Sequence, residues 1–315
     1  ELVRRFNEEN NEEAGEHWTP RDAVKLMAQL IFLPIADRIE SGTYLLYDGA
    51  CGTGGMLTVA EDILQELAEK HGKEVSTYLF GQEINAETYA ICKADLLLMG
   101  EGEAADNIVG GPAHSTLAND AFPSREFDFM LSNPPYGKSW KSDLERIAEG
   151  HNGASLFTGD AGQGESNIRR WIIENDWLEA IVALPLNMFY NTGIATYVWV
   201  LTNRKPAHRK GKVQLIDATQ WYKPLRKNLG KKNCELSVED IERICATFLA
   251  FEETEQSKIF PNGAFGYWKV TVERPLRLKV DLIADRAAFR SVCADAGEAA
   301  LATLVDGAQA KLAEG

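Results

Sequence analysis

Hydrophobic and polar positions alternate along the chain with two periods, one typical of strands and one typical of helices. Short apolar runs that end in polar or acidic residues predict strands at 44–48, 78–83, 107–109, 127–132, 178–184, 197–202, 211–217 and 267–273. Amphipathic stretches predict helices at 20–33, 56–71, 86–99, 166–175, 238–251 and 284–313. This order of elements favours an α/β fold with a doubly wound, Rossmann-like sheet and flanking helical segments.

Capping residues support the starts of several of these helices. Thr19, Pro20 and Asp22 predict an N-cap, a first helical position and an acidic first turn. Asn85 and Ser237 have N-cap side chains ahead of the helices at 86–99 and 238–251. On these residues alone, the first helix is an ordinary capped helix that stands ahead of a glycine-rich loop.

The strand predicted at 127–132 runs directly into Asn133-Pro134-Pro135-Tyr136. Two prolines stop a strand because neither can donate to a sheet ladder, and open α/β sheets bind ligands at that position. A Pro-Pro pair alone would indicate only a turn. Asn133 and Pro134, however, offer two carbonyls for an exocyclic amino group, and Tyr136 offers a ring to stack on a planar ligand. The amine lone pair would then point at an electrophile.

A glycine-rich turn follows the strand predicted at 44–48. Its glycines fall as Gly-x-x-Gly-x-Gly-Gly over residues 49–55, which differs from the Gly-x-Gly-x-x-Gly pattern of dinucleotide-binding folds. Asp48 at the strand end and a closely approachable backbone suit the ammonium and carboxylate of an amino acid. Glu83 ends the next strand, where a carboxylate can accept both hydroxyls of a ribose. The alternative for Glu83 is a solvated acidic residue.

These segments together resemble S-adenosylmethionine-dependent amino methyltransferases. Residues 133–136 resemble their catalytic loop, and residues 48–55 resemble the cofactor loop of adenine-specific DNA methyltransferases. The resemblance implies a class I methyltransferase sheet with S-adenosylmethionine as the cofactor and no metal. The catalytic residues it implies in this loop are Asn133, Pro134 and Tyr136. The cofactor-binding residues it implies are His17, Trp18, Thr19, Asp48, Ala50, Gly52, Thr53, Gly54, Gly55, Glu83, Asp120 and Ala121, with Phe122 or Ile84 against the adenine ring.

The loop between the strands predicted at 178–184 and 197–202 contains Phe189-Tyr190-Asn191-Thr192-Gly193-Ile194. The two strands could be a plain antiparallel hairpin, but the loop closely resembles a motif in modification subunits of type I restriction systems. The resemblance implies N6 methylation of adenine in double-stranded DNA by base flipping, with Phe189 or Tyr190 as a second wall for the flipped base. It also implies partners: a DNA specificity subunit, a second modification subunit and a translocating restriction subunit that can join them.

Charge limits how such a chain could hold DNA. The 315 residues carry a net charge of −14, whereas a nucleic-acid binder that acts alone is usually basic. The best candidates for phosphate contact are the clustered residues Lys223, Arg226, Lys227, Lys231 and Lys232. We therefore expect the isolated chain to bind DNA weakly and without sequence preference, and a partner to supply specificity.

The remaining composition is that of an ordinary globular protein. No run of about 18 apolar residues occurs, and no signal-peptide pattern opens the sequence. The five cysteines are scattered without a Cys-x-x-Cys pair, which argues against a zinc site or a disulfide framework. These features fit a reducing cytoplasm and no membrane contact.

We predict three parts of the chain. Residues 1–16 are the remnant of an N-terminal helical region, 17–217 form the catalytic domain, and 218–315 form a partly helical extension that docks on a partner. Residues 137–150 supply neither the helix nor the strand that a doubly wound sheet needs after Tyr136. We therefore expect a missing stretch near 143–148, where some consecutive Cα atoms would lie farther apart than ~3.8 Å.

Two alternatives stay open at this point. Protein glutamine or RNA adenine methyltransferases also carry Asn-Pro-Pro-Tyr, and the loop at 189–196 is what argues against them. A non-catalytic binding subunit would keep the fold for assembly only, although Asp48, Glu83 and Asn133 are all intact. No recognisable target-recognition domain follows the catalytic core, so the methylated DNA sequence cannot be read from this chain.

Overall fold

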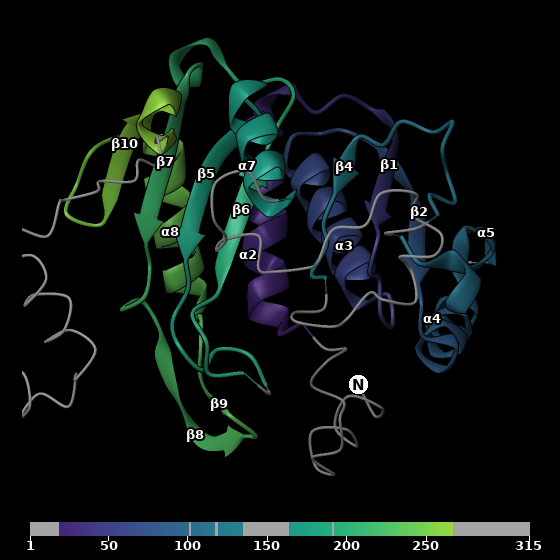
Figure 1. Ribbon diagram of the computed structural model, residues 1–315. Helices are drawn as coiled ribbons and strands as arrows, with labels where there is room; N and C mark the ends of the chain where they lie inside the picture. The colour runs from purple at the N-terminus through teal and green to yellow at the C-terminus, as the bar shows by residue number, and fades with distance from the viewer. Residues whose placement is uncertain (1–18, 101, 117–118, 135–163, 191, 267–315) are drawn as a thin grey trace, which may run out of the picture. The chain divides into compact units, whose positions relative to one another are not determined.

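The computed structural model of the chain describes residues 19–100, 102–116, 119–134, 164–190 and 192–266 (Figure 1). Two compact units are distinguished, Glu1–Trp268 and Lys269–Gly315, and every described residue belongs to the first. The strand expected at 267–273, the helix expected at 284–313 and the break expected near 143–148 lie outside the described residues. The predicted domain boundaries also stay predictions.

A parallel sheet carries the first half of the described chain, with its strands in the order β3-β2-β1-β4. The strands are β1 (Gly42–Asp48), β2 (Val75–Glu83), β3 (Ile108–Gly110) and β4 (Phe129–Met130). Leu46 of β1 pairs with Leu79 on one side and with Phe129 on the other. The strand order reverses between β1 and β4, which is the switch point where doubly wound sheets bind ligands. The predicted fold class is confirmed.

Helices precede, connect and follow these strands, and most of the predicted ones begin within a few residues of their predicted starts. The α-helices of the described residues are α2 (Arg21–Phe32), α3 (Gly55–Lys70), α4 (Ala86–Met99), α5 (Gly102–Asp106), α7 (Gly164–Glu174) and α8 (Val238–Ala250). Short 3-10 helices lie at η2 (Leu33–Arg38), η3 (Pro112–His114), η4 (Ala207–Arg209) and η5 (Asn262–Phe265). Asn85 caps α4 by accepting from the amides of Glu87 and Thr88 at 2.9 and 3.0 Å. Ser237 and Asp240 form a capping box at α8.

A mixed sheet carries the second half, in the order β10-β7-β5-β6. Its strands are β5 (Leu178–Ala183), β6 (Tyr197–Leu201), β7 (Lys212–Asp217) and β10 (Ser257–Pro261). β5 and β7 are parallel, whereas β6 and β10 are each antiparallel to their neighbour. A separate hairpin of β8 (Lys223–Leu229) and β9 (Lys232–Glu235) extends beyond the end of this sheet in Figure 1.

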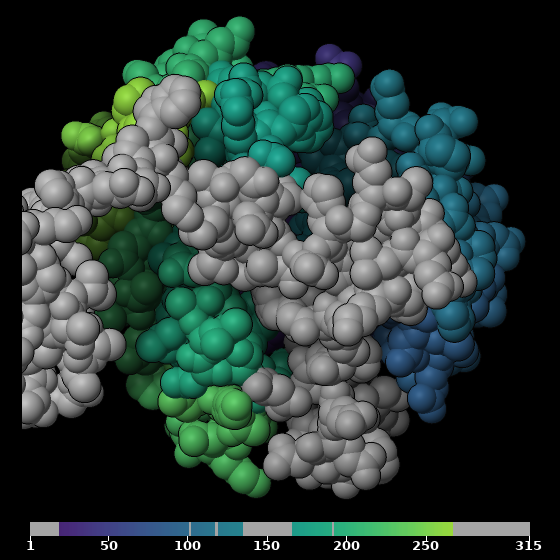
Figure 2. Space-filling view, viewed as in Figure 1, coloured from purple at the N-terminus to yellow at the C-terminus, as the bar shows by residue number. Residues whose placement is uncertain are grey.

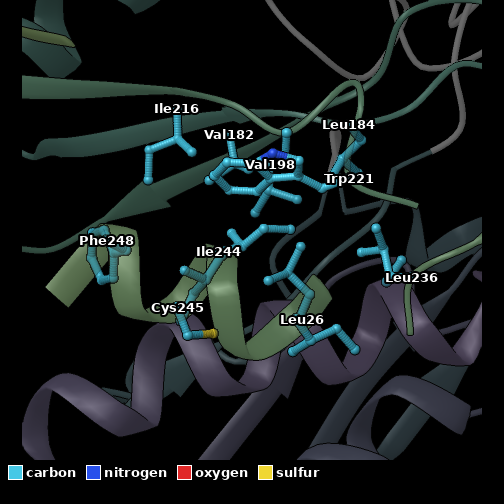
Figure 3. Close-up of a cluster of buried hydrophobic side chains, with 14 of the residues drawn as sticks. Leu26, Val182, Leu184, Val198, Ile216, Trp221, Leu236, Ile244, Cys245 and Phe248 are labelled. Carbon is cyan, nitrogen blue, oxygen red and sulfur yellow. The ribbon is translucent and has the colours of Figure 1, made fainter. Parts of the chain in front are cut away.

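Helix α2 is buried on two sides because it contributes to the cores of both sheets. One side, with Ala23, Leu26 and Leu30, packs in a cluster with residues of β5, β6 and α8. Figure 3 shows Leu26 in this cluster together with Val182, Trp221 and Phe248. The other side, with Val24, Ala28 and Phe32, packs in the core of the parallel sheet. The helix therefore joins the two halves of the unit.

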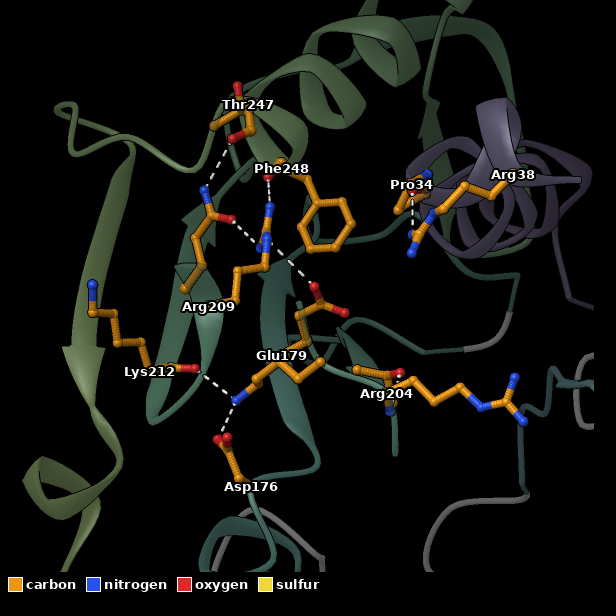
Figure 4. A network of polar contacts seen from close by, with 12 residues as sticks. Pro34, Arg38, Asp176, Glu179, Arg204, Arg209, Lys212, Thr247 and Phe248 are labelled. Carbon is orange, nitrogen blue, oxygen red and sulfur yellow. Dashed lines mark hydrogen bonds and ion pairs between the residues drawn. The ribbon is translucent and has the colours of Figure 1, made fainter. Parts of the chain in front are cut away.

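A buried polar network holds α8 to the second sheet (Figure 4). The Arg209 guanidinium pairs with the Glu179 carboxylate at 3.3 Å and donates to the main-chain oxygen of Phe248. It also lies 4.3 Å from the ring centres of both Phe248 and Phe251. Burial raises the pKa of Glu179 and lowers the pKa of Arg209. Such a pair is tolerated in the core because its charges are matched and hydrogen-bonded.

Two sequence predictions about element ends are wrong. Pro20 occupies the N-cap position of α2 without any side-chain cap, because the Thr19 hydroxyl instead accepts a hydrogen bond from Asn133. The strand expected at 127–132 is regular only over Phe129–Met130. Asp128 uses its carboxylate to accept from the Leu45 amide at 2.9 Å, which replaces a ladder bond. Met130 is 60% exposed, whereas Leu131 is buried.

The Phe248→Ala substitution should lower the free energy of unfolding by about 3–5 kcal/mol, because it leaves a cavity in a packed core. Phe248 is 1% exposed and lies over the Arg209 guanidinium. The matched control on the same helix is Leu249→Ala, since Leu249 is 44% exposed and should cost less than about 1 kcal/mol. Urea unfolding measures both, and equal losses would contradict this packing.

Candidate active site

Polar side chains gather along one edge of the parallel sheet. Asp48 ends β1, Glu83 ends β2, and Asn133 follows β4 by three residues. Asp48 pairs in register with Gly81 of β2, and the amide of Leu131 donates to the carbonyl of Tyr47 at 3.1 Å. The structure therefore brings together the three side chains that the sequence singled out at strand ends.

Asp48 is almost fully buried, with 1% of its surface exposed. Its Oδ1 accepts from the Ala50 amide at 2.9 Å, and its carboxylate also takes a hydrogen bond from Ser132, next to Asn133. Burial raises the pKa of Asp48 to about 7; the nearby Glu83 charge adds to this effect, and the two hydrogen bonds oppose it. A cationic ligand group at this carboxylate would favour its ionised form.

Glu83 fixes the glycine-rich turn to the end of β2. Its Oε2 accepts from the Gly52 amide at 2.9 Å, and its Oε1 accepts from the Asn85 amide at 2.8 Å. The neighbouring Cys51 amide donates to the Gln82 carbonyl at 3.0 Å. Because each carboxylate oxygen has two lone pairs, Glu83 retains acceptor capacity for ligand hydroxyls. The solvated alternative for Glu83 is wrong, since the residue is buried.

The turn requires glycine where the backbone enters the left-handed region. Gly52 has φ 56° and Gly54 has φ 81°. A Cβ at Gly54 would lie 2.8 Å from the Cys92 sulfur, which packs beneath the turn. α3 begins at Gly55, with Thr53 half-buried in the turn before it. The turn therefore presents backbone amides and the positive end of a helix to a ligand carboxylate.

Gln82 is a positioning residue that the sequence reasoning missed. Its fully buried side-chain amide donates to the carbonyls of His114 and Asn119 at 3.3 and 3.0 Å. Its Oε1 accepts from the Ala121 amide at 3.1 Å and from the Tyr47 hydroxyl at 2.9 Å. The only signal in the sequence is an uncharged polar residue inside an otherwise apolar strand. Gln82 holds the segment around Asp120 and Ala121 beside the sheet edge.

Within that segment, Asp120 is exposed and accepts from the Phe122 amide at 2.9 Å. The Phe122 ring packs edge-on against Phe80 and Tyr47, with ring centres 5.3 and 6.0 Å apart. Ile84 is exposed directly after Glu83. Phe122 is thus engaged in an aromatic cluster, whereas Ile84 is accessible to a planar ligand.

The Asn133 side chain is anchored from across the sequence. Its Nδ2 donates to the Thr19 hydroxyl at 3.0 Å, at the entry to α2. This contact orients the amide, with Oδ1 as its acceptor atom. The structure thus places Thr19 against the predicted catalytic residue, and its expected contact with a cofactor stays a prediction. His17, Trp18 and Tyr136 lie outside the described residues, and Pro134 is exposed.

Phe189 and Tyr190 lie in the loop between β5 and β6. Phe189 is half-buried and packs on the core cluster that α2 shares with α8. Tyr190 is held by its main-chain oxygen, which accepts from the Lys231 amide at 2.7 Å. Both aromatic residues therefore remain candidates for a stacking wall.

Several other features of the described residues bear on the site's chemistry. No group of three His, Cys, Asp or Glu side chains in this part of the chain could hold a metal ion. Cys51, Cys92, Cys234 and Cys245 are buried free thiols. No helix in the described ranges is long and apolar enough to cross a membrane.

The sequence matches a protein-family model and several curated proteins. The N-6 DNA Methylase family model matches residues 1–152 and 146–264. The type I restriction enzyme MjaIX methylase subunit of Methanocaldococcus jannaschii is 28% identical over an alignment that covers 80% of this chain and 48% of that protein. The MpnII methylase subunit of Mycoplasma pneumoniae is 27% identical, covering 80% of this chain and 50% of its own length. The chain thus spans about half the length of these curated relatives.

A solved structure extends the comparison to the fold. The type I restriction-modification system methyltransferase subunit from Streptococcus thermophilus matches with a TM-score of 0.62 and 23% sequence identity. The match covers 83% of this chain and 58% of that one. The α/β arrangement described above is therefore shared with a known methyltransferase subunit.

The Asp48→Asn substitution should stabilise the chain relative to wild type by more at pH 8 than at pH 5. The folded-state pKa of about 7 lies above the ordinary value of 3.8, so the folded chain keeps a proton that the unfolded chain has lost between these values. The stability from this proton is complete below the lower pKa and is lost as the pH rises through the upper one. Asparagine does not titrate. Urea unfolding of both proteins at the two pH values measures the difference, and an equal difference at both would contradict the shift.

Proposed function

The chain belongs to the N-6 DNA methylase family, and from this premise we propose that it methylates the N6 amino group of adenine in DNA as a type I modification subunit, with S-adenosylmethionine as the methyl donor. The observation that carries the proposal is the meeting of Asp48, Glu83 and Asn133 at one sheet edge. A fold alone hosts many chemistries, whereas this set of side chains suits methyl transfer to an amino group.

The residues of the sheet edge fit the proposed cofactor. When bound, S-adenosylmethionine supplies an electrophilic methyl group on a positively charged sulfur. Glu83 accepts hydrogen bonds from the ribose hydroxyls. The Asp48 carboxylate attracts the positive charge at the methionine end of the cofactor. Asp120, held in place through Gln82, accepts from the adenine amino group, and Ile84 covers one face of the ring. Asp48 and Glu83 are buried, and burial strengthens their contacts with the cofactor.

The residues after β4 would bind the amino group that receives the methyl. Asn133 Oδ1 and the Pro134 carbonyl accept the two hydrogens of the adenine amino group, which directs its lone pair at the methyl carbon. The cofactor would supply the methyl carbon and keep the sulfur as leaving group, and the amine held by Asn133 and Pro134 would lose a proton to solvent after transfer. Thr19 keeps the Asn133 amide in the required orientation. Tyr136 and one of Phe189 and Tyr190 stack on the base.

The hairpin of β8 and β9 is the proposed contact for DNA phosphates. Figure 2 shows it in green at the lower edge of the molecule. Its exposed basic side chains are Lys223, Arg226, Lys227 and Lys231. No acidic residue lies between Asp217 and Glu235, although the chain as a whole has a net charge of −14. We therefore assign sequence specificity to a separate specificity subunit, which also joins two modification subunits and a restriction subunit.

The Asn133→Ala substitution should slow methyl transfer by at least about 10²-fold, the scale of losing one transition-state contact. Cofactor binding should stay nearly unchanged, because in this proposal Asn133 binds the amine and not the cofactor. Single-turnover transfer of labelled methyl groups to duplex DNA measures the rate, and calorimetry measures the cofactor Kd. A large loss of cofactor binding with unchanged chemistry would refute the assignment.

The matched Glu83→Ala substitution should show the opposite pattern. Losing a charged acceptor for two hydroxyls should weaken cofactor binding by about 1.5–3 kcal/mol. The single-turnover rate at saturating cofactor should fall much less than in Asn133→Ala. An unchanged calorimetric Kd would remove Glu83 from the cofactor site.

Replacing Arg226 and Lys227 by glutamine should reduce the salt dependence of DNA binding by about two units of slope, since each phosphate contact contributes about one. Fluorescence anisotropy on a duplex, with the specificity subunit present, measures the slope over a salt series. The matched control replaces Lys210 and Lys258, which are exposed but lie outside the hairpin. The same slope change in both pairs would contradict a specific role for the hairpin.

A further inference from the structure

Strand β9 and Lys231, the residue before it, bind the loop between β5 and β6. The amides of Lys231 and Asn233 donate to the carbonyls of Tyr190 and Asn187 at 2.7 and 3.1 Å. The Cys234 thiol and the Lys232 ammonium reach the two carbonyls of Leu186 and Met188, at 3.3 and 2.9 Å. The loop that carries the proposed stacking aromatics is therefore shaped by β9.

Lys232 is unusual among the basic residues of the hairpin because it is buried, with 4% of its surface exposed. Its ammonium lies 3.3 Å from the Asp22 carboxylate, in the first turn of α2. It also lies 5.9 Å from the centre of the Tyr190 ring. The same Asp22 oxygen accepts from the Leu236 amide at 2.8 Å, just beyond β9. One ammonium thus touches α2, the loop backbone and an aromatic ring of the loop.

The other end of this chain of contacts is Asn133. Thr19 stands three residues before Asp22, at the entry to α2, and accepts from the Asn133 side chain at 3.0 Å. Thr19, just before α2, consequently contacts the proposed amine-binding residue, and Asp22 in the first turn contacts the proposed stacking loop through Lys232. Only Pro20 and Arg21 separate the two contacts along the chain, so both contacts lie at the start of α2.

A buried ion pair of this kind needs a reason beyond stability. Replacing such a pair by well-packed apolar side chains is often neutral or stabilising, so stability alone does not explain a lysine at this position. The geometry of the loop adds to this argument, because Asn187 has φ 57°, a left-handed conformation uncommon for a residue with a side chain. The Asn233 amide holds the carbonyl of that same residue.

We propose that Lys232 is a positioning residue for the methyl-transfer site: with Asp22, it fixes the loop that carries Phe189 and Tyr190 relative to Asn133. The inference rests on the proposed function, since it takes this loop to be one wall for the flipped base. Lys232 itself touches neither the cofactor nor the reacting atoms in this proposal. A misplaced wall lowers the rate because reacting groups lose their alignment.

The test compares Lys232→Met with Lys232→Arg in the full chain bound to its specificity subunit. Lys232→Met should lower kcat for methyl transfer by about 10–100-fold, the cost of a small misplacement, and change the cofactor Kd by less than about twofold. Lys232→Arg keeps the charge opposite Asp22 and should recover most of the rate. Lys210→Met removes an exposed charge elsewhere and should leave the rate unchanged.

Two further measurements keep the proposal separate from folding and from the proposed function. The double variant Asp22→Asn with Lys232→Met leaves no buried charge unpaired, so it should fold while its kcat stays low. Hydrogen exchange at the Lys231 and Asn233 amides should speed up at least about tenfold in Lys232→Met, whatever reaction the protein catalyses. If wild type transfers no methyl group to DNA, the proposed function fails, and the exchange data still show whether Lys232 fixes the loop. Unchanged exchange, or wild-type kcat in the double variant, would overturn the positioning role of Lys232.

Discussion

Parallel pairing of β1 with β2 and β4 is the constraint on which the rest of the site depends. In parallel strands the carboxyl ends meet at one edge, and here that edge receives Asp48, Glu83 and the Asn133 loop. A register shift of one residue would turn each of these side chains to the other face. Hydrogen bonds from Ser132 to Asp48 and from Gly52 to Glu83 link neighbouring strand ends directly. The cofactor side and the amine side of the site therefore cannot move independently.

Helix α2 extends this constraint to the second sheet. Its two buried sides belong to different cores, so the helix packs against both the parallel sheet and the mixed sheet. Two polar contacts lie at its start: Thr19, just before the helix, contacts Asn133, and Asp22 in the first turn contacts Lys232. A site that must hold a small cofactor and a flipped base needs walls from distant segments. The start of α2 brings two of these segments together.

The sequence predicted those parts of the site that depend on local pattern. Asp48, Glu83 and Asn133 are predicted because each ends or follows an apolar run, and the glycine turn is predicted from the spacing of its glycines. The structure explains two of these glycines by their left-handed backbone. The sequence could not predict contacts between residues far apart in the chain. Thr19 and Asn133 are separated by 114 positions, and Asp22 and Lys232 by 210. Thr19 was expected to cap a helix and Lys232 to contact phosphates, because local pattern shows no tertiary partner. Gln82 was missed for the same reason.

The central claim is that the sheet edge directs methyl transfer to an adenine amino group in DNA. The most direct measurement identifies the methylated atom after the chain, together with its specificity subunit, has reacted with duplex DNA and labelled S-adenosylmethionine. Digestion to nucleosides and mass spectrometry should place the label on N6 of deoxyadenosine, and Asn133→Ala should abolish the signal. Label on cytosine, on RNA adenine or on protein glutamine, with none on deoxyadenosine, would contradict the account.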